Sequence, residues 1–286
     1  MDRRTKLALT GAAMIAALLP LVYLAATRVE RVHTLDATIL KGFTGLGGPR
    51  VDPAARAIAT LCDPKNFVWF VAALVALALL RRRPRTAAAV AIVLAGANVT
   101  TQVLKPALAS PRLSPLLDEV GQVVPASWPS GHATASMSIA LSAVLVAPAR
   151  MRPWVASLGG LFAVAVTFSF LTLDWHYPSD VLGGFLVAAL WALSAVAALS
   201  WAQLRWPQRE PGERQAPLVG EALAPVGVTV VSVALLATML LLARPDQVTD
   251  YAEQHTLFVI GAGALGAVAL TLAAGLSLLT LRTSRR

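Results

Sequence analysis

Eight long apolar blocks constrain the fold of this 286-residue chain more than any other feature. Alanine, leucine and valine dominate them, and the chain is 57% hydrophobic and only 14% charged, whereas a soluble domain carries about a quarter charged residues. A helix of roughly 20 apolar residues spans a bilayer core. The blocks therefore predict an all-α, polytopic membrane helical bundle. They cover residues 7–27, 67–80, 87–104, 131–149, 154–173, 179–203, 217–242 and 256–280.

The first block follows Arg3, Arg4 and Lys6, as the apolar core of a signal peptide would. Its apolar run is longer than a signal core, and no small-x-small cleavage site follows it. We therefore expect an uncleaved first span. The single cysteine, Cys62, excludes an intramolecular disulfide and a cysteine-based metal cluster.

The basic residues that give the net charge of +9 lie mainly in loops between the blocks, and this distribution indicates membrane topology rather than a nucleic-acid-binding patch. Every second connection between blocks is basic, and short basic loops stay in the cytoplasm. This predicts a multi-pass cell-membrane protein with both termini cytoplasmic and no nucleic-acid partner. The basic residues are Arg3, Arg4, Lys6, Arg81, Arg82, Arg83, Arg85, Arg150, Arg152, Arg205, Arg209, Arg214, Arg282, Arg285 and Arg286.

The polar loop 205–216, which contains two prolines and one glycine, divides the chain. We expect residues 1–204 to form a six-span core, 205–216 a cytoplasmic linker, and 217–286 a two-helix membrane extension. The alternation of basic loops places residues 28–66, 105–130 and 174–178 on the opposite, extracytoplasmic face.

Three polar clusters fall on that face, each at the end of an apolar block. They are KPALASPR (105–112), PSGH (129–132) and HYPSD (176–180). Taken singly, each has an ordinary interpretation: snorkelling interfacial cations, a helix N-cap, and interfacial polar residues. Together they lie at one membrane depth and suit one ligand, a phosphate group.

The PSGH cluster opens the fourth block. The first N–H groups of a helix have no internal acceptor and carry partial positive charge, which favours anions. Ser130 adds a hydroxyl donor, and Gly131 allows close approach to the backbone. His132 would then stand beside the bound anion with a nitrogen able to exchange protons near neutral pH.

The HYPSD cluster opens the sixth block. Pro178 suits the first turn of a helix, and Asp180 within that turn can reach back to His176. A carboxylate on one imidazole nitrogen leaves the other free as a nucleophile. With the cations Lys105 and Arg112, these residues predict phosphoryl transfer that requires no metal and no other cofactor.

The three clusters resemble the signature of the type 2 phosphatidic acid phosphatase (PAP2) family, K-x6-R-P, P-S-G-H and S-R-x5-H-x3-D. The likeness covers roughly residues 30 to 200. Members of the family typically have six spans, so the two-helix extension at residues 217–286 would be an addition. The likeness implies a phosphohistidine at His176, Asp180 as its orienting partner and His132 as general acid. The phosphate ligands it implies are Lys105, Arg112, Ser130 and Gly131.

The chain departs from this signature at two positions. Leu113 replaces proline, and Phe170, after Ser169, replaces the arginine of the third motif. A hydrogen bond to a charged group is worth roughly 1.5–3 kcal/mol, so losing it weakens transition-state binding about ten- to over a hundredfold. Candidate substitutes on the outer face are Lys41, Arg50, Arg56 and Lys65.

The sequence thus predicts a hydrolase of a lipid phosphate or diphosphate at the outer leaflet. Polyprenyl phosphates or diphosphates, phosphatidic acid and phosphatidylglycerol phosphate all fit. A phosphotransferase acting between lipids is the alternative, since a phosphodiester carries less charge and would suit Phe170. A catalytically weakened lipid-binding relative is the third interpretation. The oligomeric state stays open.

Overall fold

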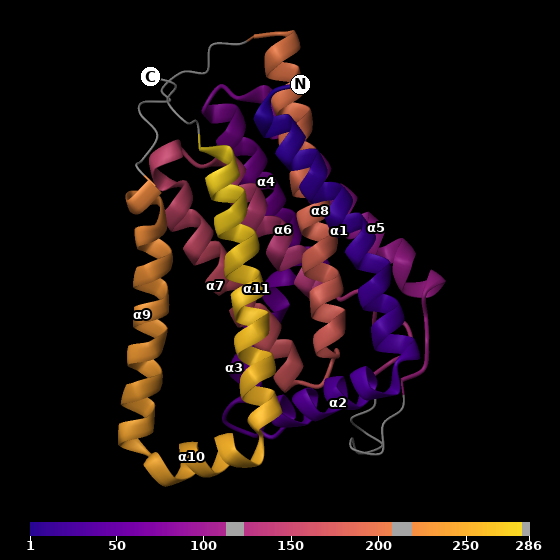
Figure 1. Cartoon of the computed structure of the whole chain (residues 1–286), viewed down its shortest axis with the longest axis vertical. Helices are drawn as coiled ribbons and strands as arrows, with labels where there is room; N and C mark the ends of the chain where they lie inside the picture. The colour runs from indigo at the N-terminus through magenta and orange to yellow at the C-terminus, as the bar shows by residue number, and fades with distance from the viewer. Residues whose placement is uncertain (113–122, 208–218, 282–286) are drawn as a thin grey trace.

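Helices make up nearly all the regular structure of the chain (Figure 1). The computed structural model describes residues 1–112, 123–207 and 219–281. No strand occurs in these ranges, and the predicted all-α class is confirmed. The helices are α1 (Arg3–Arg28), α2 (Glu30–Thr44), α3 (Asp52–Ala59), η1 (Thr60–Cys62), α4 (Pro64–Leu80), α5 (Pro84–Ala107), α6 (Gly131–Val146), η3 (Ala149–Met151), α7 (Arg152–Thr172), α8 (Pro178–Arg205), α9 (Val219–Ala243), α10 (Pro245–Gln254) and α11 (Thr256–Thr280).

Each apolar block contains one long helix, namely α1, α4, α5, α6, α7, α8, α9 or α11. Six helices in the described ranges are long and apolar enough to cross a membrane: α1, α5, α7, α8, α9 and α11. The segment from α3 to α4 passes the same test as a pair bent by 52°, and α6 is shorter, at 16 residues. The chain is therefore a multi-pass membrane protein.

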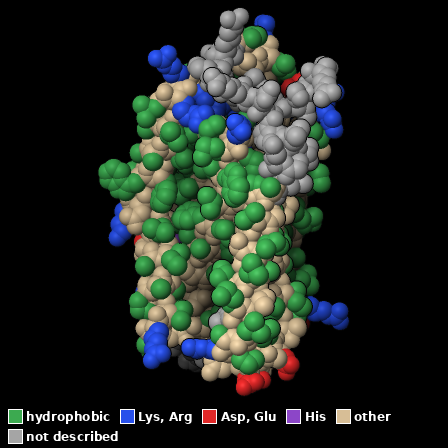
Figure 2. All heavy atoms as spheres, turned by 90° about the vertical axis from the view of Figure 1, so that its left-hand side faces the viewer, with side chains coloured by type: hydrophobic (Ala, Val, Ile, Leu, Met, Phe, Trp, Pro, Cys, Tyr) green, Lys and Arg blue, Asp and Glu red, His purple; other side chains and the backbone are tan. Residues whose placement is uncertain are grey.

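The long helices run alongside one another, while α2 and α10 lie across one end of the bundle (Figure 1). The start of α1 and the end of α11 lie at the other end. Figure 2 shows a flank covered by hydrophobic side chains, with Lys and Arg concentrated near its two ends. Such a flank matches the apolar interior of a bilayer. The cytoplasmic assignment of the termini stays a prediction, and part of its support, Arg209, Arg214, Arg282, Arg285 and Arg286, lies outside the described residues.

Helix α6 forms the centre of the bundle. Nearly all of its residues from Ala133 to Val146 are buried, and it packs against α5, α7 and α8. Small residues allow this packing, as at Gly159 of α7, where an added Cβ would lie 2.9 Å from the Cβ of Ala140. The first turn of α6 is thereby held between the neighbouring helices.

Helix α11 packs against α7, α2, α6 and α8. At one end the buried Arg152 donates to the carbonyl of Thr280 at 2.6 Å. Toward the other end Phe258 packs edge-on against Phe43 of α2, with ring centroids 4.8 Å apart, and Tyr251 of α10 donates to the carbonyl of Gly42 at 2.5 Å. The predicted extension thus rests on the core, and most of the predicted linker 205–216 lies outside the described residues.

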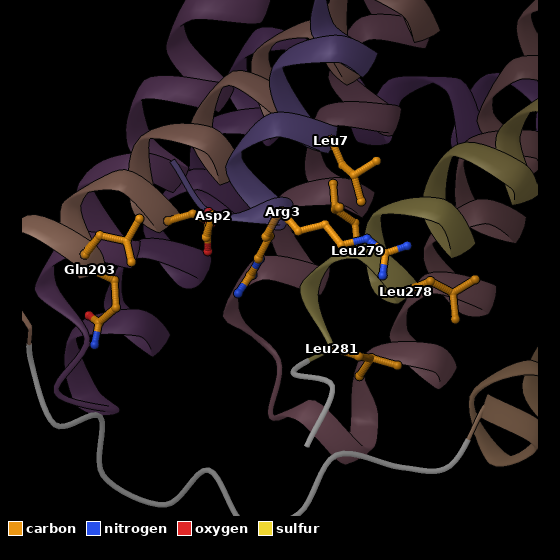
Figure 3. Close-up of a pocket in the computed structure, with 10 residues that line it drawn as sticks. Asp2, Arg3, Leu7, Gln203, Leu278, Leu279 and Leu281 are labelled. Carbon is orange, nitrogen blue, oxygen red and sulfur yellow. The ribbon is translucent and has the colours of Figure 1, made fainter. Parts of the chain in front are cut away.

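A pocket of about 500 Å³ opens where α1 begins and where α8 and α11 end (Figure 3). Leu7, Leu278 and Leu279 supply apolar walls, and Arg3 and Gln203 are polar lining residues. This pocket lies at the end of the bundle where α1 begins and α11 ends. The three polar clusters of the sequence lie at the other end, where α6 and α8 begin.

Candidate active site

The first turns of α6 and α8 meet directly. Ser130, the N-cap of α6, donates its backbone N–H to the carbonyl of Asp180 at 2.9 Å, and its hydroxyl accepts from the N–H of Ala133 at 3.3 Å. Gly184 makes this approach possible, because an added Cβ there would lie 2.6 Å from the Ser130 carbonyl oxygen. The PSGH and HYPSD clusters therefore share one location.

His176 and Asp180 form a pair fixed by the start of α8. Pro178 occupies the first turn, and Oδ2 of Asp180 accepts from the backbone N–H of Tyr177 at 3.0 Å and lies 3.3 Å from Nδ1 of His176. Both side chains are buried. With Nδ1 facing the carboxylate, Nε2 is the nitrogen of His176 that can act on a ligand.

Arg112 binds the far side of the same carboxylate. Its guanidinium forms an ion pair with Oδ1 of Asp180 and donates to Ser127 Oγ at 2.7 Å and Ser179 Oγ at 2.9 Å. Asp36 Oδ2 lies 3.5 Å from it. The predicted phosphate ligand thus directs both terminal nitrogens of its guanidinium at protein groups.

Asp36 of α2 completes this cluster, and no sequence motif predicted that it would lie at the site. Its carboxylate accepts from the N–H of Ser179 at 2.9 Å and from the Ser179 hydroxyl at 2.5 Å. Burial raises the pKa of Asp36 to about 7, although the Ser179 hydrogen bonds and the charge of Arg112 oppose that rise. His33 of α2 belongs here too, with Nε2 3.0 Å from the Arg112 carbonyl oxygen.

His132 has a carboxylate partner of its own. Its Nε2 lies 3.1 Å from Oδ1 of Asp63, which precedes α4. This pair is more open than the first, since the His132 side chain is 21% exposed and that of Asp63 29%. Asp63 is 69 positions away in sequence and falls in none of the three clusters.

Phe170 stands against both imidazoles. Its ring centroid lies 5.8 Å from that of His132 and 5.4 Å from that of His176. Phe170 is fully buried, and its carbonyl accepts from the N–H of Trp175, whose ring is 5.5 Å from His132. The Ser169 hydroxyl donates within its own helix, to the Val166 carbonyl at 2.7 Å.

Lys105 brings positive charge to the start of α6. Its Nζ lies 3.9 Å from the position that a Cβ on Gly131 would occupy, and Nε2 of Gln102 lies 3.7 Å from that position. Within the described ranges Lys105 forms no ion pair at 4 Å or closer. Lys41, Arg50, Arg56 and Lys65, the suggested substitutes for the missing arginine, are all exposed.

The buried site favours a neutral His176. Desolvation lowers the pKa of its imidazole, and the charges of Lys105 and His132 lower it further, whereas the Asp180 carboxylate opposes the shift. A neutral imidazole whose Nε2 lone pair is free has the protonation state of a nucleophile. Among the described residues, no group of three or more His, Cys, Asp or Glu side chains could hold a metal ion.

The clusters at these two helix starts carry the motifs that resemble the PAP2 signature, and both lie within the region that a family model matches. Residues 86–205 match the model of the PAP2 superfamily, and the matched region ends where α8 ends.

Among solved structures, the chain is similar to a transmembrane PAP2 type phosphatidylglycerolphosphate phosphatase from Bacillus subtilis. The TM-score is 0.54 at 20% identity, over 68% of this chain and 98% of that one. At this identity the likeness concerns the fold. No curated protein matches the chain.

Proposed function

We propose that this protein is a membrane lipid phosphatase that hydrolyses a lipid phosphate or diphosphate through a phosphohistidine intermediate. One observation carries the proposal: the imidazoles of His132 and His176 both contact the ring of Phe170, and each is paired with its own carboxylate. Two positioned imidazoles supply the nucleophile and the proton donor that a two-step phosphoryl transfer requires.

His176 is the proposed nucleophile. Its Nδ1 is held by Asp180, so Nε2 attacks phosphorus while the bond to the lipid oxygen breaks. His132 gives a proton to that leaving oxygen. Water then attacks the phosphohistidine, loses a proton to His132, and releases phosphate and free His176.

Phosphate binding falls to the start of α6 and to Lys105. Backbone N–H groups of the first turn, the Ser130 hydroxyl and the Lys105 ammonium would face the non-bridging oxygens, where negative charge builds up. Gly131 leaves room for the anion. Arg112, also predicted from the family motif, would contribute mainly by holding Asp180. The reaction so described needs no metal ion.

The lipid class follows from the surroundings of the site. The bundle presents an apolar flank, and the site lies at the end remote from the start of α1 and the end of α11. With the termini cytoplasmic, as the basic loops predict, the site would face the outer leaflet. The similar Bacillus subtilis structure is that of a phosphatidylglycerolphosphate phosphatase, which supports a phosphorylated lipid as substrate.

A substrate panel tests the proposal. Purified protein in detergent receives polyprenyl phosphate, polyprenyl diphosphate, phosphatidic acid and phosphatidylglycerol phosphate, each with and without an acceptor lipid. Release of inorganic phosphate that does not depend on the acceptor is expected. No turnover of any of these lipids by the folded protein would contradict the proposal.

A phosphotransferase is the second candidate, and Phe170 is the observation that favours it. The arginine of the family motif is replaced by a buried ring, and Arg112 is engaged by carboxylates. Both features suit a phosphate group of lower charge, such as a phosphodiester. In the same panel, a new phospholipid formed only with acceptor present would identify this activity.

A further inference from the structure

The position of Asp63 points to a role beyond ordinary helix capping. Asp63 is the N-cap residue of α4, and its backbone carbonyl accepts from the N–H groups of Asn66 and Phe67 at 2.9 and 2.8 Å. An aspartate at this position usually turns its carboxylate onto the first turn of its own helix. Here the side chain makes no capping hydrogen bond, and Oδ1 lies 3.1 Å from Nε2 of His132.

This contact fixes which nitrogen of His132 can work. A carboxylate only accepts hydrogen bonds when ionised, so Nε2 carries the proton between the two groups. Within the described part of the chain, Nδ1 of His132 has no hydrogen-bond partner. In the neutral ring Nδ1 is therefore the nitrogen with the free lone pair.

We propose that Asp63 is a positioning residue that holds the Nε2–H form of His132, so that Nδ1 performs the proton transfers of the reaction. The proposal rests on the phosphatase function proposed above. When the P–O bond to the lipid breaks and Nε2 of His176 bonds to phosphorus, Nδ1–H of the His132 imidazolium gives its proton to the leaving oxygen. Asp63 stabilises the imidazolium through Nε2–H.

The second step uses the same nitrogen in reverse. Neutral His132 keeps its proton on Nε2, and Nδ1 accepts the proton of the attacking water as the bond between His176 and phosphorus breaks. The two histidines thus work through opposite nitrogens, Nε2 in His176 and Nδ1 in His132, because Asp180 and Asp63 bind opposite sides of their rings.

A comparison of leaving groups tests this role in catalysis. The proton donor matters for a lipid alkoxide, whereas p-nitrophenolate leaves without protonation. Asp63→Asn should lower the ratio of lipid-phosphate to p-nitrophenyl-phosphate turnover by about ten- to a hundredfold, a share of the roughly 10²–10⁴-fold contributed by a general acid. In a His132→Ala background the same substitution should change the ratio no further.

Asp52→Asn is the matched control. Asp52 belongs to the same outer segment and binds the backbone N–H of Gly48 at 2.8 Å. This substitution should leave the ratio as in the wild type. An unchanged ratio in Asp63→Asn, or a full additional loss in the His132→Ala background, overturns the proposal.

Nitrogen NMR tests the tautomer without any substrate. The chain has four histidines, so full-length protein labelled with ¹⁵N-histidine gives few signals, and His132→Gln assigns the relevant one. We expect neutral His132 to be protonated at Nε2 and bare at Nδ1, with a mixture of tautomers in Asp63→Asn. A wild-type Nδ1–H form, or no change in Asp63→Asn, overturns the proposal even if the protein hydrolyses none of the lipids.

Discussion

The two histidines of the site are held in different ways. His176 is buried, and its partner Asp180 is bound on both carboxylate oxygens, by Arg112 on one side and by His176 and the Tyr177 backbone on the other. His132 and Asp63 form a single, partly exposed contact. The difference matches the proposed roles: a nucleophile gains from a fixed orientation, and a group that exchanges protons with a leaving group and with water needs access to both.

The largest effect should come from the buried pair of His176 and Asp180, the closed pair. His176→Ala removes the atom that accepts the phosphoryl group, and lipid-phosphate turnover should fall by roughly 10⁴-fold or more. Phosphate release from the purified variant measures this loss, and circular dichroism verifies the fold. Substantial remaining turnover would exclude His176 as the nucleophile.

The partly exposed pair of His132 and Asp63, the open pair, should give a smaller effect that depends on the leaving group of the substrate. His132→Ala should slow lipid-phosphate hydrolysis by about 10²–10⁴-fold, the usual contribution of a positioned general acid. A substrate with a good leaving group should still phosphorylate His176. Equal losses on both kinds of substrate would show that His132 has another role.

Substitutions that disrupt the two pairs should also lower the free energy of unfolding by different amounts. Arg112→Gln leaves Asp180 buried without its cation, and removing one partner of a buried ion pair costs about 3–5 kcal/mol. Asp63→Asn breaks a partly exposed contact, for which about 0–1 kcal/mol is expected. Unfolding of both variants in detergent gives the comparison, and similar losses would contradict the distinction between closed and open pairs.

Phe170 lies between the two pairs, so a substitution there tests both. Phe170→Arg restores the arginine of the family motif, but it places a cation in a fully buried position against two imidazoles. We expect a lower melting temperature and about a tenfold slower hydrolysis, with Phe170→Leu as the apolar control. Faster hydrolysis by Phe170→Arg would mean that the site still has room for the missing ligand.

The last effect concerns pH. Because burial raises the pKa of Asp36 from 3.8 to about 7, the folded chain keeps a proton there that the unfolded chain has released. The contribution of Asp36 to stability therefore falls as pH rises from about 4 to about 7. Asp36→Asn should remove this part of the pH dependence, with Asp52→Asn as control. Parallel stability curves for wild type and Asp36→Asn would refute the shift.

The fold was largely predictable from the sequence because the bilayer imposes a simple rule. Each spanning helix needs a long apolar run, and all eight runs contain helices. The basic loops predict that both termini are cytoplasmic, and in Figure 1 the start of α1 and the end of α11 lie at the same end of the bundle.

The site was predictable only in part. PSGH and HYPSD carry local signals, a helix start beside a histidine, and these two clusters meet in space. Asp36 and Asp63 have no such signal, since each lies far along the chain from its partner and in a segment without a motif. The engagement of Arg112 by carboxylates was missed for the same reason.

Trapping of the phosphoenzyme tests the central claim most directly. Full-length protein is mixed with lipid phosphate labelled with ³²P, quenched in base within milliseconds to seconds, digested and mapped. The account predicts an acid-labile, base-stable phosphohistidine on the peptide that contains His176, absent in His176→Ala. Label on another peptide, or turnover of the labelled lipid with no label on the wild-type protein, would contradict it.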